Sequence, residues 1–398
     1  MHRSYKLTGS TYNTANLGRS VAINGHFLAA TATGYMPIQG TRPSVFIAGK
    51  TNGVWNNSFT YTINDPDIVI SSELQVALDG YGTLAIGSPD ATINGLAFGS
   101  VFIYEFNGSQ WVRKQRLTPT VQSVGGKFGK SIAFHNNRLI VGAPFSNGGR
   151  AYIYTKNGGS WSNSSIFPSL INTYPGSKLG DKVDISDNTA IISAPGHNGT
   201  GSVFILDLQG NSSPYQISNL KASSVAIENV QAIIGVDHNE FPGNASAVRF
   251  YLKEWNGWNL KKTRSSTEAG DNFGYDVDIE GSKVILSRKY ADKGSILNVG
   301  AAVLYDYWTT INSSSREAGD FDEAVEVNNL YPNPSTLSEV TFNSNEEILN
   351  VNAYSQDGSL TQLSFSGNKI DVKSLTPGLY TIQIRTAKGV EIKKLSVL

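Results

Sequence analysis

Residues 127–144 read KFGKSIAFHNNRLIVGAP, and this stretch decides the fold. It holds an alternating apolar strand at 131–134, a turn, and a second apolar strand at 139–141 that ends in small residues and Pro144. Alternation with a period of two, bounded by turn residues, is typical of paired antiparallel strands. The stretch therefore predicts a β-hairpin.

The same hairpin pattern occurs six times before residue 310. The equivalent apolar positions of the first strand are Ile23, Leu78, Phe134, Ile185, Ile227 and Ile279. Each unit continues into a third strand with alternating aromatic residues, and four units add an Asn-Gly turn and a fourth strand opening with Trp. Four antiparallel strands in a unit of about fifty residues predict a propeller blade, since one sheet alone cannot bury both faces.

The predicted fold class is all-β. We expect a six-bladed β-propeller over residues 1–310, with seven blades as the alternative, then a linker over 311–326 and a small immunoglobulin-like β-sandwich over 327–398. The sixth unit lacks the Asn-Gly turn, while residues 5–9 look like the end of a fourth strand. We expect this N-terminal strand to complete the last blade and close the ring; a tight turn at Tyr307-Trp308 is the rival hypothesis.

Composition excludes several classes of function. The 398 residues carry 32 Lys and Arg against 32 Asp and Glu, which gives no electrostatic drive toward nucleic acid or anionic membrane. There is no Cys, so disulfides, thiolate metal sites and Cys nucleophiles are excluded. No apolar run is long enough for a transmembrane helix, and the first residues lack the apolar segment of a secretory signal peptide.

The repeated residues resemble a known family. Phe128-Gly129 followed by residues 142–144 looks like the FG-GAP repeat of integrin alpha-chain propellers and their bacterial relatives. Phe273-Gly274 and Leu179-Gly180 repeat the opening, and Ser193-Ala194-Pro195 repeats the close. The resemblance implies the propeller fold, which serves binding and catalysis alike.

This sequence departs from that family in one feature that bears on metal binding. Many FG-GAP repeats carry an Asp-rich loop that binds calcium, whereas the turns between the first and second strands here are short and hold at most one carboxylate. Hard cations need six or more oxygen ligands. We therefore expect no metal and no cofactor, with calcium as the alternative; the nearest approach to a site is Asp271, Asp276 and Asp278.

The last seventy residues resemble a second family. Residues 331–334 (YPNP), 351–358, 375–382 and 393–398 are similar to the C-terminal sorting domain of type IX secretion substrates. This resemblance implies that the type IX machinery is a partner of residues 327–398 and that the protein is secreted or held on the bacterial outer-membrane surface. An ordinary carbohydrate-binding or fibronectin-like domain is the alternative.

The loops joining the second and third strands of each blade meet on one face of a propeller. We call this the 2-to-3 loop face and expect a ligand to bind there. Its predicted ligand-binding residues are Tyr35, Asp90, Phe145, His197, His238, Arg288 and Tyr290. The leading hypothesis is an adhesion protein that recognises an extracellular protein or a carbohydrate.

Two other functions stay open. A His or Tyr base beside an Arg that neutralises a uronate would suit a lyase of acidic polysaccharides, with His197, His238, Tyr290 and Arg288 as its catalytic residues. These polar residues are equally typical of ordinary loop tips, so we favour a protein that is not an enzyme. The third possibility is a purely structural surface protein.

Overall fold

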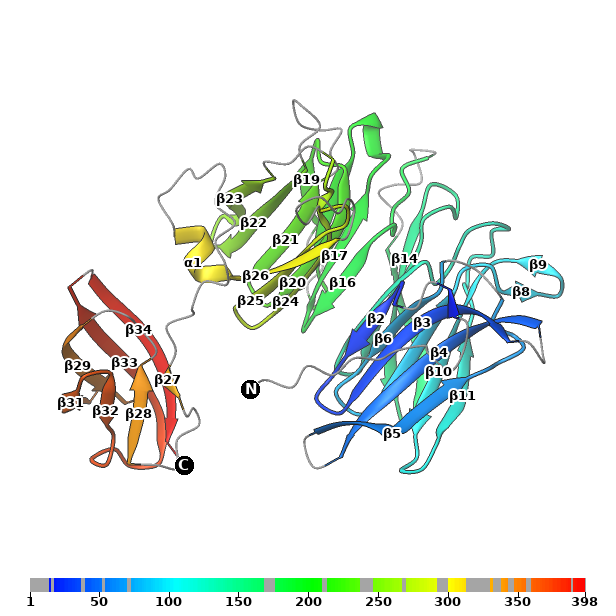
Figure 1. Ribbon diagram of the computed structural model, residues 1–398. Helices are drawn as coiled ribbons and strands as arrows, with labels where there is room; N and C mark the ends of the chain where they lie inside the picture. Colours follow the sequence, from blue (N-terminus) through cyan, green and yellow to red (C-terminus); the bar gives the residue numbers. More distant parts are fainter. Residues whose placement is uncertain are drawn as a thin grey trace. The chain divides into compact units, whose positions relative to one another are not determined.

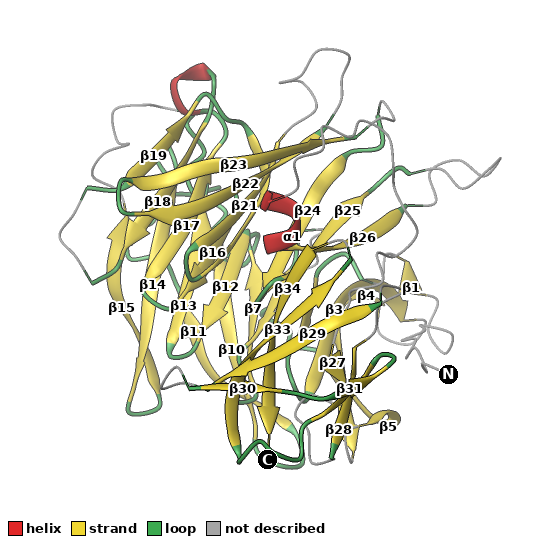
Figure 2. Cartoon of the chain, turned by 90° about the vertical axis from the view of Figure 1, so that its left-hand side faces the viewer, coloured by secondary structure: helices red, strands yellow, loops and turns green. Residues whose placement is uncertain are grey.

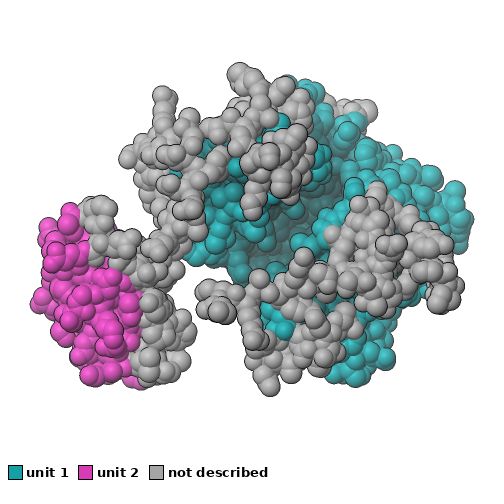
Figure 3. Space-filling model, in the orientation of Figure 1, with its two compact units in different colours: residues 1–319 teal, residues 320–398 magenta. Residues whose placement is uncertain are grey.

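The computed structural model describes residues 14–15, 18–36, 40–51, 54–69, 73–167, 176–209, 213–236, 246–266, 270–291, 300–312, 330–331, 338–342, 347–355, 359–387 and 389–397. The chain divides into two compact units, Met1–Gly319 and Asp320–Leu398 (Figure 3). This division falls within the predicted linker over 311–326.

Nearly all of the regular secondary structure in the described part of unit 1 is antiparallel strand (Figure 2). Its described residues form six successive sheets (Figure 1). Sheets one to three contain β1 (Thr14–Ala15), β2 (Val21–Ile23), β3 (Phe27–Met36), β4 (Gly40–Thr51) and β5 (Val54–Ile63); β6 (Gln75–Leu78), β7 (Thr83–Ser88), β10 (Ser100–Phe106) and β11 (Trp111–Leu117); and β12 (Ser131–His135), β13 (Arg138–Ala143), β14 (Arg150–Asn157) and β15 (Ser160–Phe167).

The fourth to sixth sheets repeat the order. They contain β16 (Val183–Ser186), β17 (Thr189–Ala194), β18 (Ser202–Asp207) and β19 (Tyr215–Ser218); β20 (Ala222–Glu228), β21 (Gln231–Val236), β22 (Ala247–Glu254) and β23 (Gly257–Ser265); and β24 (Phe273–Glu280), β25 (Lys283–Arg288) and β26 (Ala301–Asp306). A small hairpin of β8 (Thr92–Ile93) and β9 (Leu96–Ala97) follows β7, and a short 3-10 helix, η1 (His197–Gly199), follows β17. The predicted all-β propeller is confirmed.

Successive sheets pack face to face around their first strands. The first strands β6, β12, β16, β20 and β24 contact one another in chain order, so they lie innermost. Apolar side chains fill the space between sheets; Val101 and Ile103 of the second sheet share a buried cluster with Val141 and Tyr152 of the third. Burying the faces of successive sheets against one another in this way supplies the main stabilisation of the unit.

Repeated glycines explain how the third, fourth and sixth sheets begin. Gly129, Gly180 and Gly274 have φ of 94°, 85° and 74°, values that favour glycine. The N–H of Gly129 donates to the carbonyl of Gly142 at 3.0 Å, and the N–H of Gly180 donates to that of Ser193 at 2.9 Å. The Phe-Gly opening is therefore fastened to the end of the second strand in its own sheet.

A second set of glycines permits contact between sheets. A Cβ atom on Gly142 would lie 2.0 Å from the carbonyl oxygen of Gly180 in the next sheet. The same overlap with backbone recurs in the pairs Gly87–Gly129, Gly142–Gly180 and Gly235–Gly274. The small residues at the end of the second strand thus allow the backbones of successive sheets to approach closely.

The sixth sheet ends differently from the others. Its described part has three strands, and the helix α1 (Tyr307–Asn312) follows β26. The chain therefore enters a helix at Tyr307-Trp308, where a tight turn was the rival hypothesis. Tyr307 is fully buried, with its ring centroid 5.9 Å from that of Phe250. The predicted fourth strand over residues 5–9 lies outside the described residues and stays a prediction.

Unit 2 contains two four-stranded antiparallel sheets. Their strands are β27 (Leu330–Tyr331), β28 (Glu339–Phe342), β32 (Lys369–Asp371) and β31 (Phe365–Ser366), and β30 (Leu360–Gln362), β29 (Ile348–Tyr354), β33 (Gly378–Thr386) and β34 (Gly389–Val397). Phe342 and Ile370 from the first sheet and Val351 and Ile384 from the second share one buried cluster. Unit 2 is thus a two-sheet sandwich with its own core.

Candidate ligand-binding face

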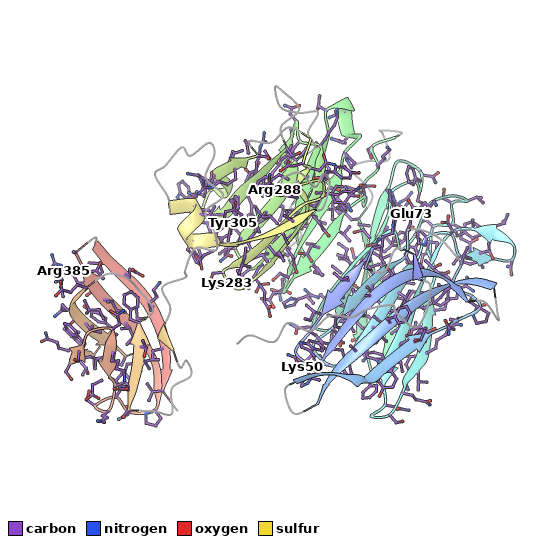
Figure 4. The ribbon with its side chains drawn as sticks, in the orientation of Figure 1. Lys50, Glu73, Lys283, Arg288, Tyr305 and Arg385 are labelled. Atoms are coloured by element: carbon purple, nitrogen blue, oxygen red, sulfur yellow. The ribbon has the colours of Figure 1, made fainter. Side chains whose placement is uncertain are left out.

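The second strand of every sheet in unit 1 runs in the same sense, away from the turn that joins it to the first strand. Figure 4 labels both ends of β25: Lys283 lies at the turn, and Arg288 lies where the chain enters the 2-to-3 loop. Since the other five sheets repeat this connectivity, their 2-to-3 loops belong to the same face of the propeller.

Phe145 provides an exposed aromatic surface on this face. It follows β13 and Pro144, and 45% of the residue is exposed. The Lys130 Nζ lies 5.1 Å from the centre of the Phe145 ring, and the Lys178 Nζ lies 5.8 Å from it. An accessible ring between two ammonium groups can stack on an apolar surface while the cations attract an anionic group.

Tyr290 belongs to a similar group in the sixth sheet. The Lys289 Nζ lies 5.0 Å from the centre of the Tyr290 ring and 4.0 Å from that of Tyr275, which belongs to β24. Both tyrosines are exposed. The 2-to-3 loop face therefore carries two clusters of aromatic and lysine side chains: Phe145 with Lys130 and Lys178, and Tyr275 with Lys289 and Tyr290.

Asp90 is paired with a cation from the next sheet. The Lys127 Nζ lies 2.5 Å from Asp90 Oδ1 and 3.0 Å from Glu73 Oε2. This pairing links the second sheet to the third and partly neutralises Asp90. Its geometry suits a role in fixing the loop.

His197 is buried rather than presented to solvent. Only 4% of the residue is exposed, its Nδ1 lies 2.9 Å from Ser202 Oγ, and its ring meets the edge of Phe204. Burial lowers the pKa of His197, which favours the neutral imidazole. The side chain thus helps to shape η1 and has little surface left for a substrate.

Arg288 is likewise held inside the sixth sheet. Its Nε donates to Asp271 Oδ2 at 2.6 Å, and the Ser266 Oγ donates to the same oxygen at 2.7 Å. The Phe273 N–H donates to Asp271 Oδ1 at 3.1 Å. Asp271 therefore links the start of β24 to the end of β25. Its carboxylate oxygens accept hydrogen bonds from protein groups in this structure.

The remaining predicted positions have separate outcomes. Tyr35 was predicted in a loop, but it lies within β3, paired with Thr41 of β4, because this hairpin continues beyond the length of the others. His238 lies outside the described residues. A lyase that uses His197, His238, Tyr290 and Arg288 therefore stays a prediction.

Carboxylates cluster along the innermost strands of sheets four to six. Burial raises the pKa of Asp184 to about 7, although the Ile227 N–H donates to its Oδ2 at 2.7 Å. Burial also raises the pKa of Asp276 and of Asp278. All three residues keep contact with solvent, Asp184 the least, which limits the rise in each pKa. Among the described residues, no group of three His, Cys, Asp or Glu side chains is arranged to hold a metal ion.

The raised pKa of Asp184 predicts a pH-dependent stability. Between about pH 4 and pH 7 the folded protein holds a proton that the unfolded chain has released, so stability falls as the pH rises through this range. Asp184→Asn removes this loss and keeps an acceptor for Ile227. At pH 8 we expect the free energy of unfolding of the variant to be roughly 2 kcal/mol higher than that of the natural protein. Urea denaturation measures this difference.

The difference should disappear below about pH 3, where both states are protonated. Asp67→Asn is the matched control, because Arg113 at 2.8 Å lowers the pKa of Asp67. This control should show no gain in stability at pH 8. A constant difference for Asp184→Asn from pH 4 to pH 8 would contradict the assignment.

Lys127, Lys130 and Lys178, which reach Asp90 and Phe145, were missed as site residues by the sequence reasoning. A signal was present, because Lys127 and Lys178 each precede the Phe-Gly or Leu-Gly opening of a sheet. Both residues have positive φ, 59° and 55°. This left-handed conformation directs the Lys127 side chain to Asp90 and the Lys178 side chain to Phe145, each in the preceding sheet. Periodicity alone does not predict such contacts between sheets.

Known protein families match both unit 1 and unit 2 of the chain. Residues 111–154 match the FG-GAP repeat, from the fourth strand of one sheet to the third strand of the next. Residues 329–398 match the secretion system C-terminal sorting domain. No curated protein matches the chain. Within the part of the chain that the structure describes, no helix could span a membrane.

Solved structures resemble the chain at low sequence identity, and the three below each have a TM-score of 0.47. A chain of the mitotic checkpoint complex is 10% identical, with 73% of this chain and 75% of that one covered. The β-propeller domain of the Trilobed protease from Pyrococcus furiosus is 9% identical, with 95% and 97% covered. The acylaminoacyl peptidase of Pyrococcus horikoshii is 8% identical, with 95% and 58% covered.

The family matches agree with both resemblances found in the sequence and with the two units of the structure. A sorting domain of this kind is the mark of type IX secretion, which delivers its substrates across the outer membrane. The protein is therefore a secreted or outer-membrane-surface β-propeller that contains an FG-GAP repeat and carries a type IX secretion C-terminal sorting domain at residues 329–398.

Proposed function

We propose that the propeller is a binding module that recognises an extracellular glycan carrying acidic groups, on its 2-to-3 loop face. The observation that carries this proposal is the exposed Phe145 ring flanked by the Lys130 and Lys178 ammonium groups. The apolar face of a sugar ring stacks on an aromatic side chain, and ammonium groups pair with uronate or sulfate. The second cluster, Tyr275 with Lys289 and Tyr290, offers the same chemistry on that face.

The charges of this surface support an acidic ligand over a neutral one. Lys130 is also paired with Asp181 at 2.9 Å, so Lys178 is the cation of the first cluster better placed to meet a ligand anion. An interaction of this kind weakens with added salt, because exposed charges are screened. Binding should therefore fall as the salt concentration rises.

Phe145→Ala tests the proposal. We expect it to weaken binding to an acidic polysaccharide about ten-fold, since losing one central aromatic contact costs roughly 1.4 kcal/mol. Affinity would be measured by calorimetry on the full chain, with polysaccharides of uronic or sulfated sugars found first by a glycan array. Neutral polysaccharides serve as the ligand control.

Trp255→Ala is the matched protein control. Trp255 is 97% exposed but lies in the turn between β22 and β23, on the opposite face of the propeller. It should leave the affinity unchanged. Equal losses for the two variants, or no binding to any acidic glycan on the array, would overturn the glycan proposal.

A further inference from the structure

Two interfaces between successive sheets have matching backbones. Residues 87–90, at the end of β7, read GSPD, and residues 142–145, at the end of β13, read GAPF. In both stretches the glycine meets a carbonyl oxygen of the following sheet, to which a Cβ atom would lie at 2.1 Å and 2.0 Å. Asp90 and Phe145 therefore occupy equivalent positions, each at the start of a 2-to-3 loop.

A lysine from the following sheet approaches each of these positions. Lys127 and Lys178 stand directly before the openings of the third and fourth sheets, with φ of 59° and 55°. The Lys127 Nζ lies 2.5 Å from Asp90 Oδ1, whereas the Lys178 Nζ lies 5.8 Å from the centre of the Phe145 ring. The two lysines are thus equivalent, but one meets a carboxylate and the other meets an aromatic ring.

The charge of the second lysine is not neutralised in the same way. Lys127 also lies 3.0 Å from Glu73 Oε2, so two carboxylates of the preceding sheet surround its ammonium group. The strand registers make Gly129 the equivalent of Glu73, so the second carboxylate is missing from the third sheet as well. Among the residues that the structure describes, no carboxylate pairs with Lys178, which is exposed.

The backbone at this position does not itself require a lysine. Gly, Asn and Asp adopt the left-handed conformation more readily than Lys does. Asn272 holds the equivalent position before Phe273-Gly274, with φ of 53°. At Lys127 the ion pairs offset the cost of this conformation. At Lys178 a carboxylate from a bound ligand would supply the equivalent contact.

We propose that Lys178 binds a carboxylate of the ligand, as Lys127 binds that of Asp90, while the attached sugar ring stacks on Phe145. The assignment rests on the proposed function and narrows its ligand to a glycan that contains uronic acid, in preference to one whose anionic group is sulfate. A uronic acid carries its carboxylate directly on the sugar ring. One sugar unit can therefore stack on the aromatic ring and pair with the ammonium group beside it.

Lys178→Gln tests the assignment by calorimetry on the full chain, with polygalacturonate as the probe. We expect the variant to bind polygalacturonate about ten-fold more weakly than the natural protein, because a hydrogen bond between two charged groups is lost. Carboxyl-reduced polygalacturonate has an alcohol in place of each carboxylate. It should bind the natural protein and the variant equally, and more weakly than polygalacturonate binds the natural protein.

Lys253→Gln is the matched protein control. It removes the same charge from an exposed lysine of β22, next to the turn that carries Trp255 on the opposite face. It should leave the affinity for polygalacturonate unchanged. Urea denaturation should give both variants the stability of the natural protein, since both lysines are exposed.

A sulfated galactan without uronic acid separates the possible outcomes. If Lys178→Gln lowers the affinity for this polymer as much as that for polygalacturonate, Lys178 accepts any anion and the choice of carboxylate is overturned. If the natural protein and Lys178→Gln bind polygalacturonate equally, the role of Lys178 is refuted while the proposed function stands. If the natural protein binds neither acidic polymer nor any acidic glycan on the array, the proposed function fails as well.

Discussion

Gly142→Ala is expected to lower the free energy of unfolding of the propeller by about 3 kcal/mol or more. The new Cβ atom would lie 2.0 Å from the Gly180 carbonyl oxygen and 2.9 Å from its carbonyl carbon. Both are backbone atoms, so no rotamer change relieves the overlap, and the third and fourth sheets must separate. The apolar cluster that includes Ile140 and Val183 would then lose part of its packing.

Urea denaturation followed by tryptophan fluorescence measures this effect. Gly80→Ala is the matched control, because a Cβ there meets nothing within 4 Å and the residue is outside the left-handed region. It should change the free energy of unfolding by less than about 0.5 kcal/mol. Equal stability of the two variants would show that the sheets approach less closely than the structure indicates.

Val351→Asp is expected to abolish export of the protein. Val351 is fully buried in the core of unit 2, and an unpaired carboxylate there costs several kcal/mol, a large part of the stability of a small sandwich. The type IX machinery would then meet an unfolded sorting domain. Immunoblots of medium, outer membrane and periplasm, in a bacterium with this secretion route, would show the variant retained in the periplasm or degraded.

Leu349→Asp is the control for this variant. Leu349 lies in the same strand, β29, but is 53% exposed, so a carboxylate there stays in water. Export of this control should equal that of the natural protein. Deleting residues 327–398 should also block release while leaving the propeller folded, since the two units have separate cores. Normal release of Val351→Asp would refute a need for the folded sandwich.

The fold was largely predictable because propeller blades repeat. Six hairpins with the same alternation, followed by aromatic third strands, identify antiparallel sheets without knowledge of their neighbours. The β-structure predicted for residues 327–398 is also present, as two four-stranded sheets. The limits of the first hairpin were wrong at Tyr35, since strand length in a twisted sheet depends on pairing partners as well as local sequence.

The candidate site was only partly predictable. Sequence position placed Phe145 and Tyr290 at the ends of second strands, and the structure leaves both exposed. The same reasoning treated His197 and Arg288 as equally available, although both are buried. Loop residues of the same type differ in exposure because packing against the adjoining sheet determines which side chains are buried. This packing brings together residues that are far apart in the sequence.

The sequence by itself determined the class of protein: a repeat-built propeller, a separate sorting domain and the absence of cysteine chemistry. Even the glycine pairs were visible, since Gly142 and Gly180 each belong to a repeated motif. Only the tertiary structure decided that these two glycines touch and that Lys178 reaches Phe145. The reason is physical: local alternation specifies a sheet, whereas the packing of one sheet on the next depends on contacts that no single repeat contains.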